Sequence, residues 1–342
     1  MPQSPGDVAM TAPIVATDFD SLRAALARSS ISATTMNFIV WIDDVGFRDW
    51  VLERTAKILD KHPARAIVLD ACADGKPGAT LVRSEPDDAD AAHITVQGER
   101  VEIGVAGMST EQIRELTASL TMNELPTLLW WTGKGITGQP NFDALVHLAD
   151  SLVVDSSGTR NDNATVVELV RFLDSRRSVG IRDLAWMRLR PWQDMIARFF
   201  DDPTLREELY SVRSLQIISG SDAEALYLGG WLASRLGWTA SGHDEFSDQS
   251  GVRIPFRSER AGRIRRVRSV ELTTTTTTYN ATVSDDDETL VVVKASGKNA
   301  MNGRFVPLQA VDSPSLLERA ILEGSTDEVF ETALRMVGAL TA

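Results

Sequence analysis

Carboxylates that close apolar segments are the residues of this chain best placed to do chemistry. Asp43 and Asp44 follow the apolar run 36–42, and Asp155 ends the run 151–155. The carboxyl ends of parallel strands are where α/β sheets gather their binding sites, so these side chains could bind a metal. Turn formation is the more common role of an aspartate at a strand end. Both roles stay open at the level of the sequence.

No other motif matches a chemical site. The loop 133–138 contains Lys134 between glycines but lacks the Gly-Lys-Ser/Thr order and the long following helix of a phosphate-binding loop. The four histidines share no metal-ligand spacing, and one cysteine, Cys72, is too few for a typical zinc site. No Gly-x-Ser-x-Gly elbow is present. The sequence therefore predicts a protein that is not an enzyme, without catalytic residues, cofactor or metal.

Arginines beside a tryptophan form the first candidate binding surface. Trp186, Arg188 and Arg190 alternate with Met187 and Leu189. An extended segment would carry the tryptophan and both arginines on one side. Tryptophan and arginine are enriched at interface hot spots, so we predict that these three residues bind a partner. The alternative is a solvated lead-in to the helix that follows.

That helix is predicted to be a core element. Pro191 suits its first turn, where the missing N–H costs nothing. Five apolar side chains then fall on one helical face, at i, i+3, i+4, i+7 and i+8. They are Trp192, Met195, Ile196, Phe199 and Phe200.

A second group of arginines lies at 263–268 in an otherwise acidic chain. In a strand, Arg266 and Arg268 would share one side with Ile264 and Val270, so the run is not a uniform basic stripe. Such a run is usually a solvated strand face. The alternative is a binding edge for an acidic partner or an anion. We add Arg266 and Arg268 to the predicted partner-binding residues.

Composition narrows the class of protein. The chain has 342 residues, 43% of them hydrophobic, which is enough for two cores. Its net charge of −13 makes nucleic acid and anionic membranes poor partners. No apolar run is long enough to span a membrane, and residues 1–17 lack the pattern of a signal peptide. A lone cysteine rules out an intrachain disulfide and fits a reducing compartment. We expect a cytoplasmic protein.

The pattern of elements predicts two domains after a flexible tail and leading helix at 1–30. Residues 31–175 read as a three-layer-like α/β domain, because apolar strands alternate with helices and so favour a largely parallel sheet. The expected strands are 36–42, 65–71, 127–131 and 151–155, and the expected helices are 50–62, 109–122 and 142–149. Residues 74–92 read as an exposed excursion, and 94–97 with 100–105 as a hairpin.

The second domain, 176–342, is predicted to be α+β with an antiparallel sheet. A strand at 212–219 and a helix at 222–236, ended by Gly237, open it. Further strands are expected at 263–278, which includes six consecutive threonines, at 289–295 and at 303–309. Helices at 315–322 and 326–340 close the chain.

Six segments, in this order, resemble the glucose-6-phosphate dehydrogenase assembly protein family, OpcA. Each is weak alone, but they occur in register, and the likeness covers roughly residues 30–320. They are Met36–Val40, His62–Val68, Leu125–Trp131, Leu148–Ser156, Asp183–Trp192 and Gly230–Trp238.

The resemblance implies a function. Members of that family are described as non-catalytic proteins that associate with glucose-6-phosphate dehydrogenase and promote its assembly or activity. It implies that the partner of this chain is that dehydrogenase and that the chain is an allosteric activator in the oxidative pentose phosphate pathway, which supplies NADPH. The sequence predicts neither a monomer nor an oligomer.

Two positions depart from the family pattern. Cyanobacterial members are linked to thioredoxin-dependent control through cysteines, whereas Cys72 alone excludes an internal dithiol switch. Arg190 stands before Pro191 where the family often has a capping residue such as threonine. Two other functions stay open: a small-molecule sensor, and an enzyme that binds a sugar phosphate or nucleotide at strand ends. The enzyme would require Asp43, Asp44, Lys134 and Asp155 to converge in one pocket.

Overall fold

The protein forms two compact units in the computed structural model. The structure describes residues 14–16, 19, 34–73, 78–83, 98–158, 162–175, 178–261, 266–309, 313–322 and 327–341. The first unit is Met1–Val154 with Ser178–Gly180, and the second is Asp155–Arg177 with Ile181–Ala342. Helix α5 (Asp162–Ser175) lies in the second unit, where it packs on α9 (Asp222–Leu236) and α11 (Glu328–Thr341).

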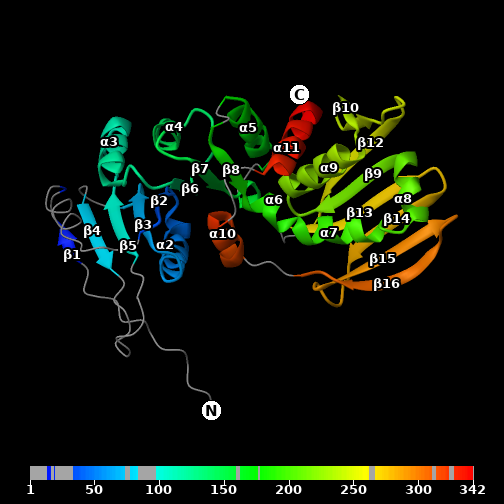
Figure 1. The fold of residues 1–342 in the computed structure, drawn as a ribbon, viewed down its shortest axis with the longest axis horizontal. Coiled ribbons are helices and arrows are strands. Elements are labelled where there is room, and N and C mark those ends of the chain that lie inside the picture. The colour runs from blue at the N-terminus through cyan, green and yellow to red at the C-terminus, as the bar shows by residue number, and fades with distance from the viewer. Residues whose placement is uncertain are drawn as a thin grey trace, which may run out of the picture. The chain divides into compact units, whose positions relative to one another are not determined.

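The described residues of the first unit build a mostly parallel sheet, as predicted (Figure 1). Its strand order is β1-β4-β5-β3-β2-β6-β7-β8, and β5, β3, β2, β6 and β7 are parallel neighbours. The order reverses between β2 and β6, the kind of position at which α/β sheets bind ligands. The strands are β1 (Ile14–Ala16), β2 (Met36–Ile42), β3 (Ala64–Asp70), β4 (Gly78–Arg83), β5 (Glu99–Gly104), β6 (Thr127–Trp131), β7 (Ser151–Val154) and β8 (Gly180–Asp183), which begins in this unit.

Burial explains the composition of these strands. Every residue of β2 and β6 is buried, which is why both read as continuous apolar runs without alternation. The accompanying helices are α2 (Val45–Leu59), α3 (Thr110–Leu120) and α4 (Pro140–Val146). Helix α3 opens with a reciprocal capping box between Ser109 and Gln112.

Two predictions at one edge of this sheet are wrong. Residues 14–16, predicted as tail, form β1 and pair antiparallel with β4. Residues 78–83, predicted as part of an exposed excursion, form β4 and pair with β5. Ala79 and Leu81 of β4 are buried, so a short alternating pattern is hidden inside a Gly- and Asp-rich stretch. The predicted strand 94–97 lies outside the described residues, as does the helix 18–30 except for Phe19.

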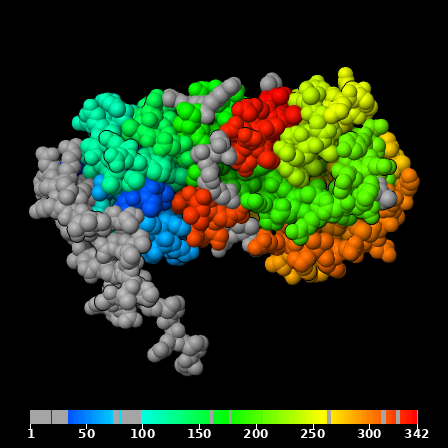
Figure 2. Space-filling view, in the orientation of Figure 1, coloured from blue at the N-terminus to red at the C-terminus, as the bar shows by residue number. Residues whose placement is uncertain are grey.

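The described residues of the second unit form an open, mostly antiparallel sheet, as predicted (Figure 1). Its order is β10-β11-β12-β9-β13-β14-β15-β16, in which only the β12–β9 pair is parallel. Strand β16 lies at the edge, and most of it is exposed at the surface (Figure 2). The strands are β9 (Val212–Ser219), β10 (Thr239–Gly242), β11 (Glu245–Ser247), β12 (Arg253–Arg260), β13 (Val267–Thr274), β14 (Thr277–Val283), β15 (Leu290–Gly297) and β16 (Met301–Pro307).

Helices of the second unit pack on this sheet and on one another. In α7 (Arg190–Phe199), the predicted apolar face is confirmed: Trp192, Met195 and Ile196 are buried, as is Phe200 just beyond the helix. Phe199 is half-buried and contacts Tyr279 edge-on. Within the described residues, we find no helix whose length and apolar character suit it to cross a membrane. The remaining helical elements are η1 (Ser156–Gly158), α6 (Leu184–Arg188), α8 (Pro203–Arg206), η2 (Glu207–Ser211) and α10 (Ser313–Leu322).

Two glycines let the central helix α9 pack closely on its neighbours. A Cβ added at Gly229 would come within 2.7 Å of the Phe256 ring, and one at Gly230 within 2.6 Å of the Ala333 carbonyl oxygen. Side chains at these positions would push the helix off β12 and α11. Close packing therefore explains two residues that cost helix propensity.

The threonine run contains a turn, so the prediction of one strand over 263–278 is wrong. Strand β13 ends at Thr274 and β14 begins at Thr277. The hydroxyl of Thr274 donates to the Thr277 carbonyl at 3.0 Å and accepts the Thr277 N–H at 3.0 Å. A buried carboxylate, Glu208, holds this turn by accepting hydrogen bonds from hydroxyls at both strand ends. Threonine propensity predicted strands here but gave no sign of the turn between them.

Candidate functional site

The stretch that carries Trp186 and Arg188 is helical, so the predicted extended segment is wrong. Asp183 caps α6, because its Oδ1 accepts the Ala185 N–H at 2.9 Å and the Ser156 N–H at 3.1 Å. The Tyr227 hydroxyl donates to Oδ2 of the same carboxylate at 2.7 Å. Asp183 is buried and accepts three hydrogen bonds, which favour a helical start for residues 184–188. The alternation of side chains had predicted a strand there.

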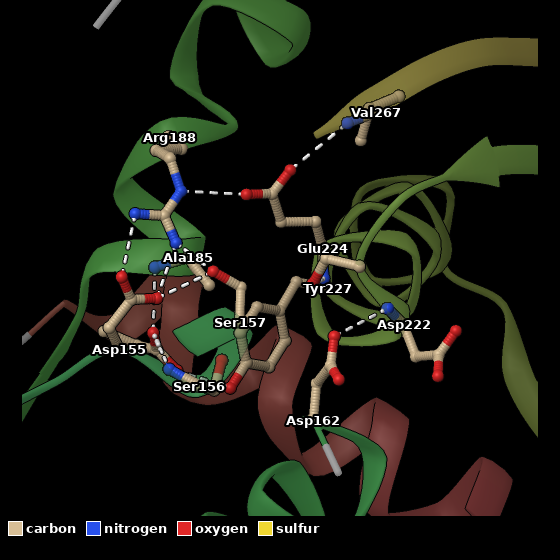
Figure 3. Close-up of polar contacts among 12 residues, drawn as sticks. Asp155, Ser156, Ser157, Asp162, Ala185, Arg188, Asp222, Glu224, Tyr227 and Val267 are labelled. Atoms are coloured by element: carbon tan, nitrogen blue, oxygen red, sulfur yellow. Dashed lines mark hydrogen bonds and ion pairs between the residues drawn. The ribbon is translucent and has the colours of Figure 1, made fainter. Parts of the chain in front are cut away.

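Arg188 is the centre of a polar cluster within the second unit (Figure 3). Its guanidinium, 10% exposed, donates to Asp155 through Nη1 at 3.1 Å and through Nη2 at 2.5 Å. Its Nε donates to Glu224 Oε1 at 2.9 Å, and Nη2 also donates to the Ser157 hydroxyl. The other oxygen of Glu224 accepts the Val267 N–H at 3.2 Å. Arg188 thus ties η1, α6, α9 and the start of β13 together.

The pKa values in this cluster reflect burial and the presence of three carboxyl groups around one cation, Arg188. Burial raises the pKa of Glu224 to about 7 although Arg188 opposes the shift. Burial, together with the charge of Asp155, raises the pKa of Asp183 to about 6. Burial acts on Asp155 in the same sense, but the charge and hydrogen bonds of Arg188 outweigh it and lower the pKa of Asp155. Burial opposes the charge of Arg188 as well, yet Asp155 and Glu224 raise its pKa, so this guanidinium stays charged.

Trp186 and Arg190, the neighbours of Arg188 in the predicted set, have different environments. Trp186 is 7% exposed, donates from Nε1 to Asp327 at 2.9 Å, and packs against the rings of Tyr227 and Phe330. Arg190 is exposed at the first position of α7. The N-cap of α7 is Leu189, whose side chain makes no capping hydrogen bond. This agrees with the absence of a capping residue before Pro191 in the sequence. Trp186 therefore contributes to packing, and Arg190 lies at the surface.

Three of the five predicted partner-binding residues line one open hollow in the second unit. Arg188 lies at its floor, and Arg266 and Arg268 lie on its rim beside Glu288. We call this the arginine hollow; its lining is Arg188, Pro191, Trp192, Glu224, Arg266, Val267, Arg268, Val283, Glu288, Leu308 and Gln309. Two arginine groups that lie far apart in the sequence are thus brought together by the fold.

Sequence reasoning missed Asp183 and Glu224, which position Arg188. The available signal was an acidic residue inside an apolar helix: Glu224 stands among Ala223, Ala225 and Leu226. Lys, Glu, Arg and Asp are almost never fully buried unless they are paired, so such a glutamate indicates a cation nearby.

At the strand ends of the first unit, Asp43, Asp44 and Lys134 lie together, while Asp43 Oδ1 and Trp41 Nε1 are buried without a hydrogen-bond partner among the described residues. Asp44 caps α2 by accepting the Gly46 N–H at 2.9 Å, and Asp43 accepts the Lys134 N–H at 3.1 Å. The rings of Trp41 and Trp131, on the two strands that flank the switch point, stack at 5.2 Å. Asp155 belongs to the second unit and is bound to Arg188.

Metal binding and thiol reactivity find no support in the described part of the chain. No group of three or more His, Cys, Asp or Glu residues there is arranged to hold a metal ion. Burial, with a further contribution from Asp70, raises the pKa of the Cys72 thiol. The thiolate is the reactive form of cysteine, and a raised pKa disfavours that form.

Comparison with known sequences identifies the class of protein. Two family models match the chain, and they describe the two domains of a glucose-6-phosphate dehydrogenase subunit. Residues 55–171 match the model of its N-terminal domain, and residues 179–334 match the model of its C-terminal domain. The two models together match both halves of the chain. The chain belongs to the OpcA family.

Curated relatives bear the same family name. The chain is 33% identical over 144 residues to the OxPP cycle protein OpcA of Synechocystis sp., covering 42% of this chain and 29% of that protein. It is 33% identical over 170 residues to OpcA of Synechococcus elongatus, covering 48% of this chain and 36% of the relative. The matches thus span about a third of the length of these relatives.

Solved structures with a similar fold are oxidoreductases. The 3-ketoreductase KijD10 of Actinomadura kijaniata, in complex with NADP, has a TM-score of 0.49 and 12% identity, covering 90% of this chain and 96% of that one. An oxidoreductase of Thermotoga maritima has a TM-score of 0.46 and 11% identity, covering 89% and 96%.

Proposed function

We propose that this protein is a non-catalytic partner of glucose-6-phosphate dehydrogenase, which it binds and activates in the oxidative pentose phosphate pathway. The observation that carries the proposal is that the two halves of the chain match the two domains of a family described as a glucose-6-phosphate dehydrogenase subunit. The proposed setting is the cytoplasm, in keeping with the single cysteine.

The first unit supports a role without a nucleotide cofactor. A dinucleotide places its pyrophosphate at the N-terminus of the helix that follows the first strand at the switch point. Here that position, the start of α2, holds the carboxylate of Asp44 as a cap, with Asp43 beside it. Negative charge at this position would repel a phosphate. The geometry thus disfavours the alternative of an enzyme that binds sugar phosphates or nucleotides.

The second unit supports the same proposal. Its most polar buried cluster, around Arg188, lacks the nucleophile–base pair of a covalent catalyst. Its carboxylates accept hydrogen bonds from the guanidinium and from backbone N–H groups that hold η1, α6 and β13 in place. The cluster therefore orders a surface of the second unit.

The experiment combines the purified chain with glucose-6-phosphate dehydrogenase from the same organism. We expect a complex by size-exclusion chromatography with light scattering, and faster NADPH formation at limiting glucose 6-phosphate. The chain alone is expected to form no NADPH. A dehydrogenase whose mass and rate do not change on addition of the chain would contradict the proposal, as would NADPH formation by the chain itself.

A further inference from the structure

The arginine hollow has the character of a docking site, and its interpretation rests on the proposed function. We propose that an acidic segment of the dehydrogenase inserts into this hollow and that Arg266 and Arg268 recognise its carboxylates. The floor is already neutralised, since Arg188 is paired with Asp155 and Glu224. Recognition therefore falls to the two arginines on the rim.

Arg266 is available for a partner and projects from a fixed backbone. Its side chain is exposed and makes no hydrogen bond or ion pair with the part of the chain that the structure describes. Its carbonyl oxygen accepts the Gly220 N–H at 3.0 Å, and the next N–H, of Val267, is bound to buried Glu224. The peptide group between Arg266 and Val267 is thus held by hydrogen bonds at both its oxygen and its nitrogen, which lowers the ordering cost of binding through the Arg266 side chain.

Arg268 shows that this rim accepts carboxylates. It is 29% exposed and pairs with Glu288 at 3.2 Å and with Asp285 at 4.0 Å. Both acids are more than half exposed, and ion pairs of this kind contribute little to stability. A carboxylate of the dehydrogenase could therefore replace Glu288 at small cost and reach Arg266 as well.

The spacing of the two arginines favours a protein segment over a small anion. They lie two positions apart, Arg266 directly before β13 and Arg268 within it, where the pairing with β9 shifts register. Two carboxylates carried on one acidic segment could pair with the two arginines together. Pro191 and Leu308, both half-buried, line the hollow and can contact an apolar residue between the acids. Clusters of arginine recognise acidic motifs in this way.

The test reverses charge in the hollow and at a matched position. The first variant is Arg266→Glu with Arg268→Glu. The control is Arg253→Glu with Arg257→Glu, two exposed arginines of β12 that do not line the hollow and change the net charge equally. Binding of the dehydrogenase should weaken about thirtyfold or more in the first variant, as for an interface hot spot, and stay unchanged in the control. Normal binding by the first variant, or equal weakening in both, would overturn the inference.

Two further measurements keep the result interpretable. Arg266→Glu alone should weaken binding with an unchanged thermal melt, because this exposed side chain makes no hydrogen bond or ion pair with the described residues. The variants are also tested for binding of inorganic phosphate. If they lose phosphate binding but still bind the dehydrogenase normally, the hollow is a site for small anions, and the docking role is refuted. Failure of the wild-type chain to bind the dehydrogenase would instead refute the proposed function itself.

Discussion

Arg188 and Asp155 form a two-pronged ion pair, with Nη1–Oδ2 at 3.1 Å and Nη2–Oδ1 at 2.5 Å, on a side chain that also binds Glu224. The fold gives the arginines that were predicted to contact a partner two different environments. Arg188 holds the second unit together from inside, whereas Arg190, Arg266 and Arg268 reach the surface to different extents.

Loss of the Arg188 charge should destabilise the protein. Arg188→Met keeps a long apolar side chain but leaves the carboxylates of Asp155 and Glu224 without their cation. Removal of one partner from a buried ion pair typically costs about 3–5 kcal/mol. Urea denaturation measures the change, and Arg198→Met, at an exposed position of α7, should stay within about 0.5 kcal/mol of wild type. Equal stabilities for the two variants would mean that the cluster is not structural.

Glu224 should make stability depend on pH in a defined direction. Its pKa is about 7 in the folded protein against an ordinary value of 4.5, so the folded state binds the extra proton. Its stabilising contribution is therefore complete below pH 4.5 and is lost as pH rises through 7, by up to about 1.4 kcal/mol per pH unit. Glu224→Gln cannot titrate, so the stability of wild type minus that of the variant should fall from about pH 5 to 7. A difference that rises with pH would show that Arg188 lowers the pKa of Glu224 instead.

Gly230 should tolerate no side chain. A Cβ there would meet the Ala333 carbonyl oxygen at 2.6 Å and Val337 Cγ2 at 2.9 Å, where α9 packs on α11. Gly230→Ala should therefore lower stability by about 1–3 kcal/mol, even though alanine favours helix. Gly242→Ala in β10 meets nothing within 4 Å and is the control, best compared by thermal melt. A variant at Gly230 that is more stable than wild type would show that the two helices separate easily.

Glu208 should stabilise the threonine hairpin. It is 9% exposed and accepts hydrogen bonds from Thr274, Thr276, Tyr279 and Asn299. Glu208→Ala leaves buried donors unsatisfied, at a cost of about 1–3 kcal/mol. The adjacent Glu207→Ala, at an exposed position, should have little effect on the free energy of unfolding. Hydrogen exchange of the β13–β14 amides would locate the loss, and unchanged protection there would argue against this role.

The sequence predicted most of what depends on apolar periodicity. Helix 222–236 with Gly237 at its end agrees with α9 residue for residue, since Gly237 adopts a φ of 68° as a left-handed cap. The buried parallel strands β2 and β6 were likewise evident as continuous apolar runs. Apolar periodicity indicates which side chains are buried, and the side chains predicted to be buried in these elements are buried in the structure.

The errors arose where a polar side chain decides the local structure from a distance. Asp183 makes 184–188 helical through bonds to Ser156 and Tyr227, residues far away in the chain. Glu208 likewise places a turn inside six threonines. The arginine hollow combines α6 with the start of β13, and no local pattern reports such a pairing. Tertiary hydrogen bonds to buried carboxylates are invisible in a single sequence.

Direct titration of glucose-6-phosphate dehydrogenase with the purified chain tests the central claim most directly. We predict saturable binding by isothermal titration calorimetry, with a fixed stoichiometry and a parallel rise in NADPH formation by the dehydrogenase. Heat of dilution alone, at concentrations where both proteins are folded and the dehydrogenase is active, would contradict the claim that this chain is a dehydrogenase partner.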